Sequence, residues 1–421
     1  MSISGAFPQG VNEDKLYQVG DIAATARSSF KPGWLKCNGA AYTRTQLSGL
    51  YSILYSHHDY CSVDMLTRNV TQSKGTQVNG DSKIACSDTI IAVLNRYTNR
   101  NDTILFTSNN EDFSLIDLGK SNVHVLFAYE APYWYLVEYD YENDKNINLK
   151  YTTNLAGNSW TTVNVSTSTS NVPASMCING STIAILTCSG SSVWIYYGSR
   201  TGSFSSLYNL KTTSGKTIAC NYGHNSYLSI RYGKYNSSTY RWAISLFADS
   251  NVAGSGTGCA IFTNTSLSTS GWDVLYFDGD HYRNPLGLEY CEGVWGYTER
   301  SISGESLSTF YITDDYLSSL ANGPNRSMVN SVEESFKRYP GTSLWIAAGV
   351  SGKYYKISST GQPANTSSYT AKLLENMIHA ICSKNGDLAF VCPSTGIYVS
   401  DCILRVPNIT IDKSTAWIKA T

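Results

Sequence analysis

Short apolar and aromatic runs alternate with polar turns along most of the chain. The runs are rich in β-branched and aromatic side chains, and the turns are rich in Gly, Ser, Thr and Asn; clear runs lie at 89–94, 123–128, 182–186, 344–348 and 387–392. Runs of this length and composition predict β-strands. No run approaches the roughly 18 apolar residues of a membrane-spanning helix.

One strand-and-turn element recurs at a nearly constant spacing. An aromatic residue opens each copy, and the copies begin at Phe106, Tyr151, Tyr196, Phe262, Tyr311, Tyr355 and Tyr398. The steps between copies are 45, 45, 66, 49, 44 and 43 residues. A four-stranded propeller blade takes roughly 40–50 residues. We therefore predict a mainly β fold with a β-propeller of about seven blades over 85–405, the long step being a hairpin extension between Arg231 and Asp249. A β-sandwich or a β-helix is the alternative.

Charge and cysteine content limit the partners and cofactors. The chain has 31 Lys and Arg against 32 Asp and Glu, so no net field attracts nucleic acid or an anionic membrane. Several of the 11 cysteines lie in apolar runs and are expected to be buried, reduced thiols: Cys177, Cys188, Cys220, Cys382 and Cys392. We expect no cofactor and no metal. His57 and His58 beside Asp59 and Cys61 are adjacent, and adjacent residues on a strand point in opposite directions.

One turn of the repeat has a more specific pattern. The segment 153–160 reads Thr-Asn-Leu-Ala-Gly-Asn-Ser-Trp and resembles the Asp-box turn of sialidase-type propellers. Gly157 and Trp160 match that turn, whereas Leu155 replaces its aspartate. The resemblance supports the architecture and implies no activity.

Both ends of the chain differ from the repeat. Near the N-terminus, motif residues follow one another in order: Gly20, Asp21, Pro32, Gly33, Trp34, Cys37, Asn38 and Gly39. Pro-Gly and Asn-Gly predict turns, and Leu47 and Leu50 after Thr45 predict a short helix. The C-terminus reads Val-Pro-Asn-Ile over 406–409 and Ala-Trp-Ile-Lys-Ala over 416–420. This constellation resembles the collar domain of bacteriophage tail fibres.

The resemblance implies a domain plan and a location. It implies that 15–70 and 406–421 form one small collar-like α+β domain, with the propeller inserted between its halves and 1–14 as an N-terminal arm. It also implies a virion tail protein that is assembled in the host cytoplasm, contacts other phage tail proteins and forms a homo-oligomer, with a trimer favoured.

The aromatic surplus then suggests non-covalent binding of a host cell-surface receptor, most simply a glycan. Exposed Tyr and Trp rings stack on sugars and donate hydrogen bonds from one edge. Our candidate ligand-binding residues are Tyr133, Trp134, Tyr135, Tyr235, Tyr240 and Trp242.

Two alternatives remain open, a structural tail nozzle or adaptor and a glycan-cleaving propeller enzyme. Paired carboxylates could serve glycoside hydrolysis, and five carboxylates lie near one another in the sequence around Arg283: Asp278, Asp280, Glu289, Glu292 and Glu299. They fit no recognised catalytic motif, so we expect no enzyme and assign no catalytic residue.

Overall fold

The structure is a computed structural model in which part of the chain is described. The described residues are 18–19, 21–25, 32–37, 41–43, 47, 49–50, 61–69, 82–108, 112–220, 228–249, 257–278, 283–291, 294–301, 307–313, 316–318, 325–330, 332–338, 344–349, 353–358, 367–370, 380–384, 387–392, 396–405, 409–411 and 414–419. The chain divides into two compact units, a smaller one of 1–66 with 400–421 and a larger one of 67–399. The larger unit is therefore inserted into the smaller one.

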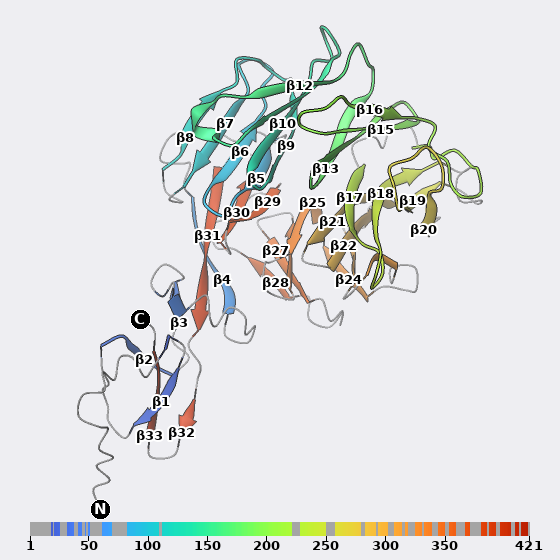
Figure 1. Cartoon of the computed structure of the whole chain (residues 1–421). Coiled ribbons are helices and arrows are strands. Elements are labelled where there is room, and N and C mark those ends of the chain that lie inside the picture. The colour runs from blue at the N-terminus through green and yellow to red at the C-terminus, as the bar shows by residue number, and fades with distance from the viewer. Residues whose placement is uncertain are drawn as a thin grey trace, which may run out of the picture. The chain divides into compact units, whose positions relative to one another are not determined.

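The larger unit is built from four-stranded antiparallel sheets that follow one another in the sequence (Figure 1). The first sheet holds β5 (Lys83–Cys86), β6 (Ile91–Asn95), β7 (Thr103–Thr107) and β8 (Ser114–Asp117). The second holds β9 (His124–Glu130), β10 (Tyr133–Tyr139), β11 (Ile147–Thr152) and β12 (Thr161–Ser166). The third holds β13 (Val172–Asn179), β14 (Thr182–Ser189), β15 (Ser192–Gly198) and β16 (Ser205–Leu207).

The next three sheets repeat this order. The fourth holds β17 (Ser229–Lys234), β18 (Tyr240–Ala248), β19 (Gly258–Asn264) and β20 (Asp273–Asp278). The fifth holds β21 (Arg283–Cys291), β22 (Val294–Ser301), β23 (Leu307–Thr313) and β24 (Asn325–Asn330). The sixth holds β25 (Val332–Arg338), β26 (Leu344–Gly349), β27 (Lys353–Ser358) and β28 (Ser367–Thr370).

The seventh sheet uses both ends of the inserted segment. Its first strands are β29 (Ala380–Lys384), β30 (Asp387–Cys392) and β31 (Gly396–Arg405), and β31 pairs with β4 (Cys61–Asn69) and with β3 (Ala41–Thr43). The first strand of every sheet contacts the first strand of the next, and β29 contacts β5. Seven sheets thus form a closed ring, which confirms the predicted mainly β fold with a propeller.

The sequence repeat marks the same strand in every sheet. The seven aromatic residues that open its copies all lie on third strands: β7, β11, β15, β19, β23, β27 and β31. Apolar side chains of the described strands pack between neighbouring sheets, as in the clusters that contain Leu136, Ile185 and Trp295. The repeat is therefore a packing repeat, in which each blade buries its faces against its two neighbours.

The long step of the repeat has a different origin from the one expected. Arg231 lies in β17 and Asp249 directly follows β18, so this region is an ordinary first hairpin rather than an extension. The additional residues instead join β16 to β17. There, 208–220 folds over the space between the third and fourth sheets: the amide of Lys211 donates to Thr269 O, and that of Cys220 donates to Ser191 O. We call 208–220 the bridging segment.

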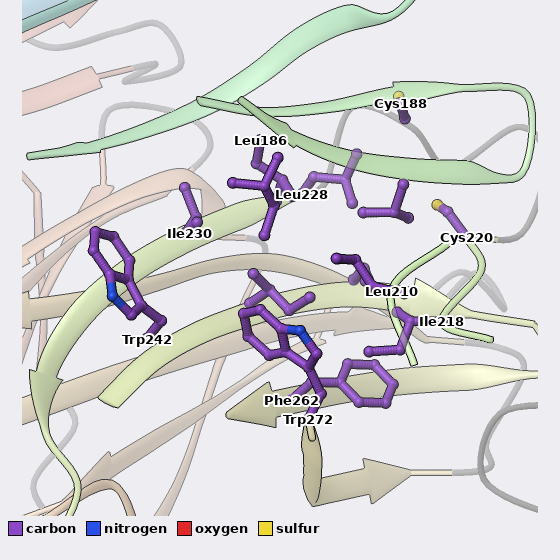
Figure 2. Close-up of a cluster of buried hydrophobic side chains, with 14 of the residues drawn as sticks. Leu186, Cys188, Leu210, Ile218, Cys220, Leu228, Ile230, Trp242, Phe262 and Trp272 are labelled. Atoms are coloured by element: carbon purple, nitrogen blue, oxygen red, sulfur yellow. The ribbon is translucent and has the colours of Figure 1, made fainter. Parts of the chain in front are cut away.

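The bridging segment extends a large apolar cluster. Leu210, Ile218 and Cys220 are at most 1% exposed, and they pack with Phe262 and Trp272. Figure 2 shows these side chains close together. Leu228, which directly precedes β17, and Ile230 of β17 belong to the same cluster. The backbone hydrogen bonds of the segment go to loops and isolated bridges rather than to a regular ladder. This irregular pairing agrees with the few strand signals in its sequence.

The turn that resembles an Asp box is a short 3₁₀ helix, η4 (Leu155–Gly157). The side chain of Asn154 accepts a hydrogen bond from the Gly157 amide, and Asn158 adopts a left-handed conformation with φ of 46°. Leu155 is 1% exposed in the cluster between the first two sheets. The leucine at the aspartate position therefore packs into the core.

The smaller unit contains a sheet made from both ends of the chain. Its strands are β1 (Ile22–Thr25), β2 (Trp34–Lys36), β32 (Thr410–Ile411) and β33 (Ser414–Lys419). The C-terminal strand β33 pairs with β1 and β2 and lies between them, and β32 pairs with β33. Ala416, Trp417 and Ile418 are buried.

The motif residues of the smaller unit lie at the turns and strands of this sheet. The Asp21 carboxylate accepts the Gln18 amide at 2.7 Å just before β1. Pro32 and Gly33 form the turn before β2, with a Gly33 φ of 83° that favours glycine, and Trp34 opens β2. Cys37 is buried after it.

Gly20, Asn38 and Gly39 lie outside the described residues, as do His57, His58 and Asp59. Leu47 and Leu50, from the expected helix, are buried.

Three of the five cysteines expected to be buried thiols are buried thiols in the structure. Cys177 is a buried free thiol, Cys188 and Cys220 are buried thiols, and burial raises the pKa of Cys177 to about 11. Cys86, which is not among these five, is disulfide-bonded. Sequence spacing does not reveal which cysteines the fold brings together. The side chains of Cys382 and Cys392 lie outside the described part. Within the described residues no helix is long and apolar enough to cross a membrane.

Candidate functional site

A polar cleft of about 480 Å³ opens between the first and second blades. Three loops line it: 98–101 between β6 and β7, 119–123 between β8 and β9, and 140–143 between β10 and β11. In an antiparallel sheet the turn between the second and third strands lies at the same end as the exit to the next sheet. All three loops therefore lie on one face of the propeller, and the cleft lies where two blades meet on it.

An exposed aromatic ring forms part of the cleft. Tyr141 is 63% exposed, and its ring centroid lies 6.4 Å from that of Tyr139. The ammonium of Lys145 lies 5.4 Å from the Tyr141 centroid. A ring that is held by neighbours but open to solvent can stack on a ligand with little loss of side-chain entropy.

The loop that carries Tyr141 is held by one carboxylate. Asp140 accepts hydrogen bonds from the backbone amides of Glu142 and Asn143, and from the Asn143 side chain at 2.8 and 2.9 Å. Burial would raise the pKa of Asp140, but these hydrogen bonds and Lys120 outweigh it and lower the pKa. Asp140 is thus a charged anchor that fixes the loop before any ligand arrives.

A buried ionic network fixes the other two loops. Asp102 is fully buried and accepts the backbone amides of Tyr97, Asn122, Val123 and His124, at 2.8 to 3.2 Å. The same carboxylate lies 2.7 Å from Nδ1 of His124. Burial would raise the pKa of Asp102, yet the hydrogen bonds from His124 and the backbone lower it. One side chain therefore joins the 98–101 and 119–123 loops.

Glu138 extends this network within the second blade, to which His124 also belongs. Its Oε1 lies 3.1 Å from Nε2 of His124, and both Lys150 and Lys120 approach its carboxylate, Lys120 at 3.5 Å. Burial would raise the pKa of Glu138, but His124 and Lys150 lower it to about 2. His124 thus lies between two carboxylates, with one ring nitrogen toward Asp102 and the other toward Glu138. Asp102, His124 and Glu138 are buried, so this part of the network supports the loops of the cleft.

Two of the three predicted residues of the second blade are buried. Tyr133, Trp134 and Tyr135 are consecutive in β10, so their side chains alternate between the two faces of the sheet. Trp134, 2% exposed, packs toward the first blade on Phe127, and Tyr135 is fully buried toward the third. Tyr133 is half-buried beneath the Arg200 guanidinium, 4.2 Å from its ring centroid. Trp134 and Tyr135 thus offer no ring face to a ligand, which corrects their assignment as surface contacts.

The predicted residues of the fourth blade are partly open. Tyr240 is 44% exposed and stacks on Tyr232 at 5.9 Å. Trp242 is 5% exposed beneath the same Tyr232, and this burial corrects its assignment as a ligand contact. Tyr235 is half-buried under the Arg241 guanidinium, at 3.9 Å.

The predicted aromatic residues do not meet at one site. They lie on the first hairpins of the second and fourth blades, which are not neighbours. First hairpins open on the face opposite to the cleft. The cleft is not evident from the sequence, because its three loops are separated along the chain and mostly polar. The one available signal was Tyr141 within a polar loop, Asp140 to Asn146, that directly follows an aromatic strand.

The side chains of two of the five carboxylates considered for an enzyme are described. Glu289 of β21 forms an ion pair with Arg231 of β17 at 2.6 Å, and Glu299 is 1% exposed in β22. Asp280 and Glu292 lie outside the described residues, and only the backbone of Asp278 and Arg283 is described. Among the described residues, no group of three or more His, Cys, Asp and Glu side chains could hold a metal ion.

Comparisons with known proteins identify the fold alone. No family model matches the chain, and no curated protein matches it. Among solved structures, YCF48 from Cyanidioschyzon merolae is similar at 12% identity, covering 80% of this chain and 98% of that chain with a TM-score of 0.50. The Dos1 propeller is similar at 11% identity, covering 80% and 94% with a TM-score of 0.48. At this level of identity the similarity to YCF48 supports a propeller and carries no function.

Proposed function

We propose that the chain is a receptor-binding protein of a bacteriophage tail and that its propeller binds a host cell-surface glycan without cleaving it. The observation that carries the proposal is the cleft between the first two blades. It combines an exposed ring, Tyr141, with amide, hydroxyl and carboxylate groups on fixed loops. Sugars are bound in this way, by one apolar face against a ring and by hydroxyl groups that donate and accept hydrogen bonds at the edges.

The tail assignment rests on the smaller unit. The order of its elements, a turn at Asp21, a Pro-Gly turn, a Trp34 strand and a closing C-terminal strand, agrees with the resemblance to collar domains. In this proposal the smaller unit contacts other tail proteins in a homo-oligomer, with a trimer favoured, and the propeller faces the host.

Labelled protein applied to a glycan array, with released reducing sugar measured in parallel, tests the proposal. We expect saturable binding without sugar release, and at least a tenfold loss of affinity in Tyr141→Ala. Tyr240→Ala is the matched control, because this tyrosine is exposed on the opposite face. Sugar release would favour an enzyme. Absence of binding by the folded, assembled protein would favour a nozzle or adaptor.

A further inference from the structure

The charges of the cleft narrow the class of glycan, given the proposed function. Lys120 is the one cation among the described residues that line the cleft, and Asp140 and Glu142 line it from the second blade. The lining therefore holds more negative than positive charge. Lys145, whose ammonium lies near the Tyr141 ring, adds a cation next to the cleft rather than inside it.

Lys120 has an anionic partner beneath the cleft, a carboxylate that it shares with Lys150. Its ammonium lies 3.5 Å from Oε2 of Glu138, which is 4% exposed. Neither nearby arginine lines the cleft: Arg96 donates to the carbonyl and side-chain oxygens of Asn122, and the Arg100 guanidinium lies over the Tyr97 ring. Within the lining, an acidic ligand thus meets one lysine that already has an anionic partner, whereas Asp140 is held ionised by its amide donors.

The remaining lining groups suit hydroxyl groups. Asn101, Ser121 and Asn143 supply side chains that can donate and accept, and Glu142 supplies an exposed acceptor. We infer that the cleft binds neutral, hydroxyl-rich saccharides and discriminates against sialylated, uronic or sulfated ones. Like charge between the ligand and the two carboxylates is the cause of the discrimination.

The test uses an array of matched pairs, each a neutral oligosaccharide and its sialylated, uronic or sulfated derivative. We expect the acidic member of a pair to bind about tenfold more weakly at 50 mM salt. The difference should shrink at 500 mM salt, because salt screens electrostatic repulsion and leaves steric exclusion unchanged. The neutral member should bind with nearly the same affinity at both concentrations.

Two isosteric variants separate this charge effect from loop structure. Glu142→Gln removes a lining charge while keeping one acceptor oxygen and the backbone amide that Asp140 accepts, so we expect the affinity for the acidic members to rise several-fold relative to that for their neutral partners. Asp144→Asn is the matched control, since Asp144 lies on the same loop outside the lining and accepts only from the Asn146 amide among the hydrogen bonds described. It should change neither affinity.

The outcomes distinguish this inference from the proposed function. Equal or tighter binding of acidic members, lost in Tyr141→Ala, would overturn the charge discrimination and leave glycan recognition standing. Discrimination that is unaffected by salt and by Glu142→Gln would also overturn it. If no member of any pair binds the folded protein, the proposed function fails and the inference fails with it.

Discussion

Burial decides what a single aromatic residue does in this propeller. Trp134 is 2% exposed and stacked on Phe127 at 5.6 Å, so Trp134→Ala should leave a cavity and lower the free energy of unfolding by about 3–5 kcal/mol. Tyr141→Ala should change it by about 0.5 kcal/mol or less, because that ring is mostly in solvent. Denaturant unfolding of both variants checks this. Equal losses would contradict the assignment of Trp134 to the core and Tyr141 to the surface.

Glu138 gives the first two blades a defined acid sensitivity. Its folded-state pKa of about 2 lies below the ordinary value of about 4.3, so it contributes stability above pH 4.3 that is lost as the pH falls toward 2. Glu138→Gln should cost about 3 kcal/mol near pH 7, because it leaves the buried His124 and the partly buried Lys150 with a weaker partner. Its unfolding midpoint should then depend less on pH between 4.3 and 2 than that of the unchanged protein. Parallel pH profiles of the two proteins would contradict this role.

At the scale of elements, the bridging segment should behave as part of the core although it has little regular structure. The amides of Thr213, Ile218 and Cys220 donate to backbone carbonyls, and Ile218 is 1% exposed. We expect slow hydrogen exchange in 210–220, similar to that of the neighbouring strands. Trp272→Ala should remove this protection, since the fully buried Trp272 side chain packs in one cluster with Leu210, Ile218 and Cys220 of the segment.

Trp160→Ala provides the matched control for that measurement by hydrogen exchange and mass spectrometry. Trp160 directly precedes the fourth strand of the second blade, as Trp272 directly precedes that of the fourth, but Trp160 packs between the first two blades. Protection of 210–220 should survive in this control. Fast exchange of the segment in the unchanged protein would show that it is not held as described.

The elements also show which parts of the fold are readable from the sequence. The third strand of each blade could be predicted because its opening aromatic residue recurs at blade spacing. The bridging segment could not, because its buried Leu210 and Ile218 stand among polar residues without a strand period. The burial of Trp134 and Tyr135 could not be predicted, because it depends on the alternation of β10, which directs the two side chains into the clusters on opposite faces of the sheet.

At the scale of the whole molecule, the cleft depends on the closed ring of seven sheets. The cleft is formed by loops of two sheets that lie together only because consecutive blades pack side by side. Asp102, His124 and Glu138 join those two sheets. His124 lies 22 residues after Asp102 and 14 residues before Glu138, so no local sequence pattern connects the three. The seventh sheet likewise pairs β4 with β31, although β4 lies before the first copy of the sequence repeat.

The most direct test of glycan recognition is a crystal structure of the protein with an oligosaccharide found on the array. We predict a sugar ring stacked on Tyr141, with its hydroxyl groups bound by the 98–101 and 140–143 loops. A sugar bound instead at Tyr240 or Tyr133, on the opposite face, would contradict the assignment of the cleft as the recognition site and return that role to the first-hairpin aromatic residues.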